Sequence, residues 1–192
     1  MHIPDGFIDL PTSAAFAGAS ALAVAGAVKG ARKQLSEQSA PLAGLTAVFI
    51  FAVQMLNFPV AAGTSGHLIG AALAMVLVGP YAATLALVVV LIIQAFLFAD
   101  GGLTALGLSI FNMAVISVWV SFAVFMLLKK ILPKTKSWLV VATFISALIS
   151  VPAAAVGFVI QYAIGANATF SVSAVLNAMV GTHIIIGIGE AI

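Results

Sequence analysis

Long apolar runs alternate with short polar stretches along this chain, and the runs are the length of membrane-spanning helices. Such a helix needs about 20 mostly apolar residues. The pattern predicts an all-α membrane protein with about seven transmembrane helices in a compact bundle. The expected helices cover residues 12–30, 41–58, 67–79, 80–99, 104–129, 137–163 and 171–191.

The expected helix 67–79 is too short to cross a bilayer without tilting or a re-entrant start. A glycine-containing stretch, 61–66, precedes it, and Gly79-Pro80 marks its end. Extended backbone at this depth must be buried in protein or line a wet cavity, because lipid cannot satisfy its polar groups. Helix 137–163 carries Pro152, which predicts a kink.

The composition agrees with this membrane assignment. Hydrophobic residues make up 64% of the chain and charged residues 6%, whereas a soluble domain has about 25% charged residues. We expect residues 1–192 to form one transmembrane domain surrounded by lipid, with no nucleic acid as a partner. The absence of cysteine excludes thiolate metal sites and cysteine nucleophiles.

The basic residues form two clusters, one after the first expected helix and one between the fifth and sixth. The positive-inside rule makes both clusters cytoplasmic. With seven spans, the amino terminus then lies outside and the carboxyl terminus inside. Met1, His2, His67 and Asp100 are expected on the outer side. The clusters are Lys29, Arg32 and Lys33, and Lys129, Lys130, Lys134 and Lys136.

His2 is the most informative residue for function. The amino group of Met1, the amide nitrogen of His2 and the imidazole Nδ1 of His2 can close two chelate rings around one metal ion. His67 supplies a fourth nitrogen. Four nitrogens, three of them in a planar chelate, suit Ni(II) or Cu(II), and the lack of a carboxylate argues against hard cations. The site requires a native, unextended Met1.

Simpler interpretations exist for each histidine. His2 can be an interfacial polar residue, and His67 a polar residue at a helix end. His183, in the middle of an expected helix, is interpreted as a neutral buried imidazole bonded to a neighbouring helix. Polar residues that can support the metal ligands, or equally form interhelical hydrogen bonds, are Asn57, Thr64, Ser65, Gln94, Asp100 and Asn112.

Three segments carry a family resemblance: MHIPDGF, GTSGHLIG and FADGGLTALGLSIFNMA. They resemble the nickel/cobalt substrate-binding (S) component of energy-coupling factor (ECF) transporters, the NikM/CbiM family. The resemblance implies that residues 1–11 are an inserted metal-binding segment, with His2 and His67 as ligands. It also implies a transmembrane coupling (T) subunit, ATPase (A) subunits and, optionally, a small accessory membrane subunit as partners. The PDG and SGHLIG segments look closer to the nickel branch.

The function predicted from these features is capture of Ni²⁺, or Co²⁺, as transported substrate for ATP-driven uptake. The protein is then multi-pass in the plasma membrane of a prokaryote. The chain contains no GxxxxGK[ST] phosphate loop, so it has no ATP site of that kind, and no HExxH helix, so we do not expect an enzyme. The alternatives are a cobalt(II)-specific S component serving cobalamin biosynthesis and a secondary metal transporter or channel acting without ATPase partners.

Overall fold

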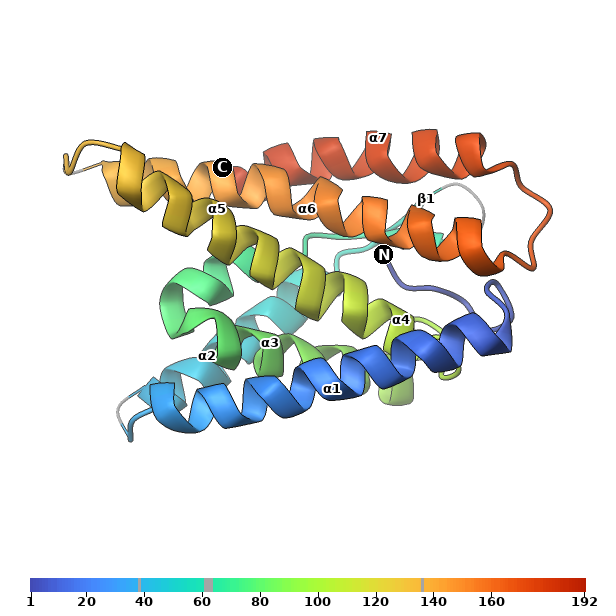
Figure 1. Cartoon of the computed structure of the whole chain (residues 1–192), viewed down its shortest axis with the longest axis horizontal. Helices are drawn as coiled ribbons and strands as arrows, with labels where there is room; N and C mark the ends of the chain where they lie inside the picture. The colour runs from blue at the N-terminus through green and yellow to red at the C-terminus, as the bar shows by residue number, and fades with distance from the viewer. Residues whose placement is uncertain (38, 61–63, 136) are drawn as a thin grey trace.

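The structure is a computed structural model that describes residues 1–37, 39–60, 64–135 and 137–192, apart from the side chains of Phe58 and Thr64. The regular structure of these described residues is helical except for one short antiparallel hairpin and an isolated bridge between Ile8 and Ala166 (Figure 1). The elements are α1 (Leu10–Gln34), α2 (Ser39–Gln54), β1 (Phe58–Val60), β2 (Thr64–Gly66), α3 (Ala71–Phe98), α4 (Leu106–Ile110), the π-helix η2 (Phe111–Ile116), α5 (Ser117–Ile131), α6 (Trp138–Gly165) and α7 (Val172–Ala191).

Five of the described helices are long and apolar enough to cross a membrane. They are α1, α3, the continuous stretch 106–131 that joins α4, η2 and α5, α6 and α7, while α2 has only 16 residues. The predicted count of about seven is therefore not confirmed, because the expected helices 67–79 and 80–99 are parts of one element, α3. The outside position of the amino terminus stays a prediction.

The element α3 is bent sharply at Gly79, whose φ of 78° and ψ of 165° are not helical. A straight helix of 28 residues would be about 42 Å long. Yet His67, just before α3, and Gly101, just after it, both lie against His2. The two ends of α3 are therefore close together, and the break expected at Gly79-Pro80 turns the chain back. The first arm, residues 71–78, spans only about 12 Å.

The expected helix boundaries differ from the observed ones by up to four residues, as two examples show. Helix α2 ends at Gln54 rather than residue 58, and Pro59 disfavours helical backbone in the residue before it. Helix α3 begins at Ala71 rather than residue 67, after an extended segment that ends in left-handed Gly70 (φ 78°). Helix α6 continues through Pro152 without interruption, so the expected kink there stays a prediction.

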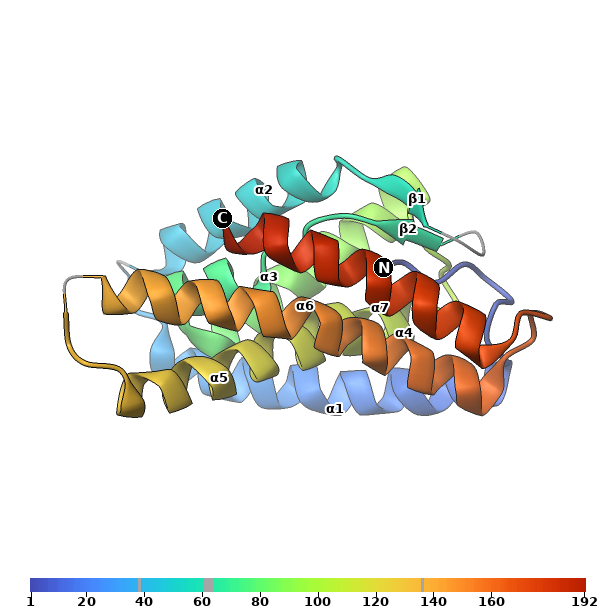
Figure 2. The same ribbon diagram turned by 90° about the horizontal axis from the view of Figure 1, so that it is seen from above.

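The helices pack around α3, which contacts α1, α2, α5 and α6, and α7 covers α6 on the outside (Figures 1 and 2). Apolar side chains of α3, α5 and α6 form the core together with Met1 and Ile3 from the amino terminus. The N-terminal segment thus contributes to the core itself. Asp9 caps α1 by accepting a hydrogen bond from the Thr12 amide (2.8 Å), which fixes where the segment ends.

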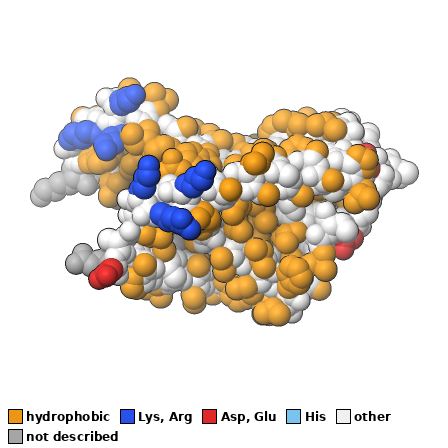
Figure 3. Space-filling view, turned by 60° about the horizontal axis from the view of Figure 1, so that its bottom comes forward, with side chains coloured by type: hydrophobic (Ala, Val, Ile, Leu, Met, Phe, Trp, Pro, Cys, Tyr) orange, Lys and Arg blue, Asp and Glu red, His pale blue; other side chains and the backbone are white. Residues whose placement is uncertain are grey.

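The basic side chains in view gather at one end of the molecule, and hydrophobic side chains are spread over much of the rest of the face that Figure 3 shows. Lys29, Arg32 and Lys33 lie at the carboxyl end of α1, and Lys129 and Lys130 at that of α5. Lys136 lies outside the described residues. This division is the one that a protein spanning a lipid bilayer requires.

Candidate metal centre

The N-terminal segment enters the helix bundle and is fixed there by hydrogen bonds. Met1 and Ile3 are fully buried. The Gly102 amide donates to the Ile3 carbonyl (2.8 Å), and the Asp5 carboxylate accepts from the amide (2.8 Å) and hydroxyl (2.5 Å) of Thr104. The loop after α3 therefore holds the segment along its length.

The insertion brings His2 and His67 together. Both are buried, and their ring centroids are 5.0 Å apart with an interplanar angle of 35°. The Nδ1 of His67 lies 2.7 Å from the Leu68 carbonyl oxygen. A carbonyl only accepts, so Nδ1 carries the proton and Nε2 keeps its lone pair. That Nε2 is buried and has no hydrogen-bond partner in the described part of the chain.

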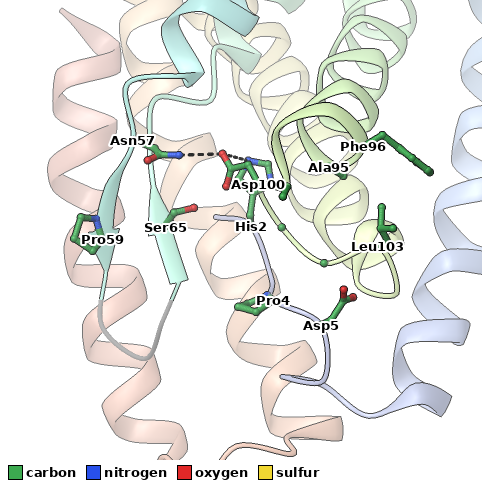
Figure 4. Close-up of a pocket in the computed structure, with 13 residues that line it drawn as sticks. His2, Pro4, Asp5, Asn57, Pro59, Ser65, Ala95, Phe96, Asp100 and Leu103 are labelled. Atoms are coloured by element: carbon green, nitrogen blue, oxygen red, sulfur yellow. Dashed lines mark hydrogen bonds and ion pairs between the residues drawn. The ribbon is translucent and has the colours of Figure 1, made fainter.

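His2 has the opposite arrangement. Its Nε2 lies 3.5 Å from Oδ2 of Asp100, and the same oxygen accepts a hydrogen bond from Asn57 (3.0 Å), as Figure 4 shows. A carboxylate beside Nε2 favours the tautomer with the proton on Nε2, which leaves the lone pair on Nδ1. This is the ring nitrogen that can chelate together with the amine and the amide of the chain end.

Burial keeps these nitrogens neutral. It lowers the pKa of the Met1 amino group to about 5, partly offset by nearby Asp100. Burial, followed by the charge of the terminal amine, holds the pKa of His2 and of His67 well below the usual range for histidine. Near pH 7 all three groups are uncharged, so each has one nitrogen with a free lone pair.

The extended segment 67–70 is supported by side chains from three helices. The Ile69 amide donates to Oε2 of Glu190 on α7 (2.7 Å), and the Ile69 carbonyl accepts from Gln54 on α2 (2.8 Å). Gln94 of α3 in turn donates to Oε1 of Gln54 (3.0 Å). Backbone that leaves regular structure inside a membrane needs such partners, and here they hold His67 in place.

The predicted supporting residues divide into groups. Asp100 and Asn57 lie at the site, and Ser65 lines the same cavity. Gln94 donates to Gln54, which in turn donates to the Ile69 carbonyl, so Gln94 supports the segment with His67 only indirectly. Asn112 instead donates to Gln161 on α6 (2.7 Å), a separate interhelical pair. The side chain of Thr64 lies outside the described residues.

Sequence reasoning missed Gln54 and Glu190. A glutamine in the apolar helix α2 and a carboxylate near the end of α7 were the available signals, because buried polar groups in apolar helices require partners. Neither residue by itself predicts its hydrogen-bond partner, which is the backbone of Ile69 in both cases.

A cavity of about 840 Å³ lies beside His2, and Asp5, Asn57, Ser65 and Asp100 are among the other residues that line it (Figure 4). Among the described residues, no three His, Cys, Asp or Glu side chains lie close enough to share a metal ion. Side chains of these types therefore supply at most two ligands at one place, and further ligands would come from the backbone, from other side chains or from water.

Comparison with known proteins gives consistent results. The family model "Cobalt uptake substrate-specific transmembrane region" (CbiM) matches residues 2–192. A solved structure described as a truncated transition metal transporter superposes with a TM-score of 0.90 at 32% identity, covering 100% of this chain and 93% of that one.

Named relatives include transporters of both metals. The fused nickel transport protein NikMN of Rhodobacter capsulatus is 41% identical over 127 residues, which is 66% of this chain and 37% of that protein. Cobalt transport protein CbiM 1 of Pelobacter propionicus is 36% identical over 129 residues, which is 66% of this chain and 57% of that protein. These alignments span only part of each relative.

Proposed function

The chain belongs to the CbiM family of metal-transport components, and from this premise we propose that it captures Ni²⁺ as the S component of an ECF-type uptake system. The proposed ligands are the Met1 amine, the amide nitrogen and Nδ1 of His2, and Nε2 of His67. The observation that carries the proposal is the meeting of a buried, neutral amino terminus with two buried imidazoles whose rings are 5.0 Å apart.

Ligand geometry favours nickel. An amine, an amide nitrogen and Nδ1 on consecutive residues form fused five- and six-membered rings that hold three donors in one plane. His67 completes the plane, because its Nε2 has no competing hydrogen bond in the described part of the chain. Square-planar nitrogen ligation is typical of Ni(II) and Cu(II).

A cobalt-specific S component is the second candidate, and two findings favour it. The matching family model is described as a cobalt uptake region, and one of the relatives is named a cobalt transport protein. Co(II) can use the same nitrogens but does not share the strong preference for a planar site. The planar chelate therefore supports nickel over cobalt.

The energy source and orientation are part of the same proposal. The sequence lacks a phosphate-binding loop, so ATP is hydrolysed by A subunits that act through a T subunit. The end with the basic residues faces the cytoplasm by the positive-inside rule. The cavity beside His2 then opens toward the outside, where the ion arrives.

The decisive experiment places a removable domain before Met1. The intact fusion has no free amine at the site, so we expect its Ni²⁺ affinity to fall by about a thousandfold, or about 4 kcal/mol. A protease that cuts directly before Met1 should restore binding in the same sample, which makes the uncut protein its own control. Equal affinity before and after cutting would rule out the chelate.

The spectrum of the bound metal separates the two candidates. A yellow, diamagnetic nickel complex indicates four planar nitrogens. A six-coordinate spectrum, or tighter binding of Co²⁺ than of Ni²⁺ in direct competition, would favour the cobalt candidate.

A further inference from the structure

The cavity beside His2 is lined by charge of one sign. The carboxylates of Asp5 and Asp100 line it, and no lysine or arginine does so among the described residues. Asp5 is exposed, and hydrogen bonds from the side chain and backbone of Thr104 hold the pKa of its carboxyl below the usual range, so it is ionised at neutral pH. A cleft with walls of one charge attracts counter-ions and raises their local concentration.

His2 is a buried member of the cavity lining. It is 4% exposed, and its Nε2 has no hydrogen-bond partner in the described part of the chain, although it lies 3.5 Å from Oδ2 of Asp100. Oγ of Ser65, another lining residue, is also buried without a partner among the described residues. An ion in this cavity therefore meets unused polar atoms, and it lies against the residue that supplies two of the proposed ligands.

The cavity is large enough for a cation that keeps its shell of water. One water molecule occupies about 30 Å³ in the liquid, so six need roughly 180 Å³, and the cavity volume is about 840 Å³. The carboxylates do not form a ligand set of their own, because no three His, Cys, Asp or Glu side chains in the described ranges lie close enough to share an ion. Their oxygens can instead accept hydrogen bonds from the waters of a hydrated ion.

We propose that this cavity captures the hydrated divalent cation before it loses water, and that the charge of Asp5 sets the rate of capture. The inference rests on the proposed function above. Asp5 lies three residues from His2, so their Cα atoms are at most about 11 Å apart. From the cavity the ion exchanges its waters for the nitrogens of the proposed site, and the waters and the His2 amide proton pass to the solvent.

The chemistry of Ni²⁺ makes such a capture step visible in the kinetics. Ni²⁺ exchanges its bound waters slowly compared with diffusion, so a hydrated ion enters and leaves the cavity many times before the first nitrogen binds. The rate of binding is then proportional to the fraction of protein with a hydrated ion in the cavity. The rate of dissociation depends on the bonds to the final nitrogens and not on Asp5.

Asp5→Asn tests this role without moving the segment. An asparagine keeps the Oδ1 oxygen that accepts both hydrogen bonds from Thr104, so the substitution removes the charge alone. Asp100 is unsuitable because it also contacts His2. Glu37→Gln is the matched control, since it removes the same charge from the exposed loop between α1 and α2, at the other end of α1 from the N-terminal segment.

Stopped-flow mixing of the full chain, in a neutral detergent, with Ni²⁺ and a metal-indicator dye measures both rates. At an ionic strength of about 0.01 M, where the Debye length is about 30 Å, Asp5→Asn should slow association about tenfold and leave dissociation unchanged. At about 1 M, where the Debye length is about 3 Å, its association rate should come within about twofold of wild type. Glu37→Gln should match wild type in both conditions.

The outcomes distinguish this inference from the proposed function. If the wild-type protein binds no Ni²⁺, the proposed function fails. If the wild type binds tightly but Asp5→Asn associates as fast as Glu37→Gln, or changes only the dissociation rate, the capture role is overturned and the four-nitrogen site stands. The wild type gives a second test that needs no variant, because an association rate that does not fall with ionic strength overturns the capture role as well.

Discussion

Two buried polar regions of this protein differ in the kind of donor atom that they could offer to a metal ion. At the candidate metal centre, His2 and His67 meet the chain end beside a cavity of about 840 Å³. In the bundle interior, Asn112 of η2 donates to Gln161 of α6, and the backbone of Gly157 packs against Asn112. Both lie where regular α-helix is interrupted, by an extended segment in one case and a π-helical turn in the other.

Each region also keeps atoms without hydrogen-bond partners among the described residues, including Nε2 of His2 and of His67, Oδ1 of Asn112 and Nε2 of Gln161. Burial and incomplete hydrogen bonding therefore do not identify a metal site. The kind of donor does, since an imidazole lone pair beside a neutral amine is a strong ligand for a d-block ion and a neutral amide is a weak one.

Removing the polar group from each region should give the largest contrast. In His67→Ala, the loss of one of four ligands should lower Ni²⁺ affinity about a thousandfold, or about 4 kcal/mol. In Asn112→Leu, affinity should stay within about threefold, while the unpaired Gln161 should cost about 1–3 kcal/mol of stability. Metal titration and thermal unfolding of both variants measure the two effects. A large loss of affinity in Asn112→Leu would show that the regions are one functional unit.

The same two regions can be compared without changing a proposed ligand, by replacing one glycine in each region with alanine. A Cβ on Gly102 would overlap the Asp5 carboxylate and backbone. Gly102→Ala should therefore displace the N-terminal segment and weaken Ni²⁺ binding by about a hundredfold, or about 2.7 kcal/mol.

A Cβ on Gly157 would instead press on Ile116 and on Oδ1 of Asn112 (2.8 Å). Gly157→Ala should cost about 1–3 kcal/mol of stability through overpacking, with unchanged affinity. Gly181→Ala, with nothing within 4 Å of the added carbon, is the matched control for both. If Gly102→Ala binds Ni²⁺ as tightly as the control, Ni²⁺ binding does not depend on the observed position of the N-terminal segment.

The sequence could predict those features of the two regions that depend on residues adjacent in the chain, but not those that depend on residues from distant helices. The chelating donors are adjacent in the chain, and the break at Gly79-Pro80 is set by two neighbouring residues, so both could be recognised from sequence. The partners of Ile69 come from positions 54 and 190, and the partner of Asn112 from position 161. Only packing of distant helices decides these pairs, and the same polar residue types occur at both regions.

Proton release should distinguish the metal centre from an exposed chain end. An exposed amine with its ordinary pKa of about 8 would release nearly one proton at pH 7, in addition to the proton of the His2 amide. Here the pKa of the Met1 amine is lowered to about 5. It is already neutral at pH 7, so binding should release about one proton in total.

Because binding releases a proton, the apparent Ni²⁺ affinity should fall as the pH falls. Apparent Ni²⁺ affinity should fall about tenfold per pH unit from pH 8 to 6, and more steeply once the pH passes below about 5, where the amine takes up its proton. Calorimetry in buffers of different ionisation enthalpy counts the protons directly. A release of two protons at pH 7 would mean that the free protein keeps its terminus exposed.

The smallest effects should come from the residues that orient His2 without binding the metal. Asp100 lies 3.5 Å from Nε2 of His2 and Asn57 donates to the same carboxylate oxygen. Asp100→Asn should weaken Ni²⁺ binding about tenfold, as is typical when the partner of a metal-bound histidine is lost. Asn57→Ala should have a smaller effect, since it acts through Asp100. In the double variant the two losses should therefore be less than additive. Fully additive losses would mean that Asn57 acts on the site by a separate route, and no loss in Asp100→Asn would mean that the carboxylate does not set the tautomer of His2.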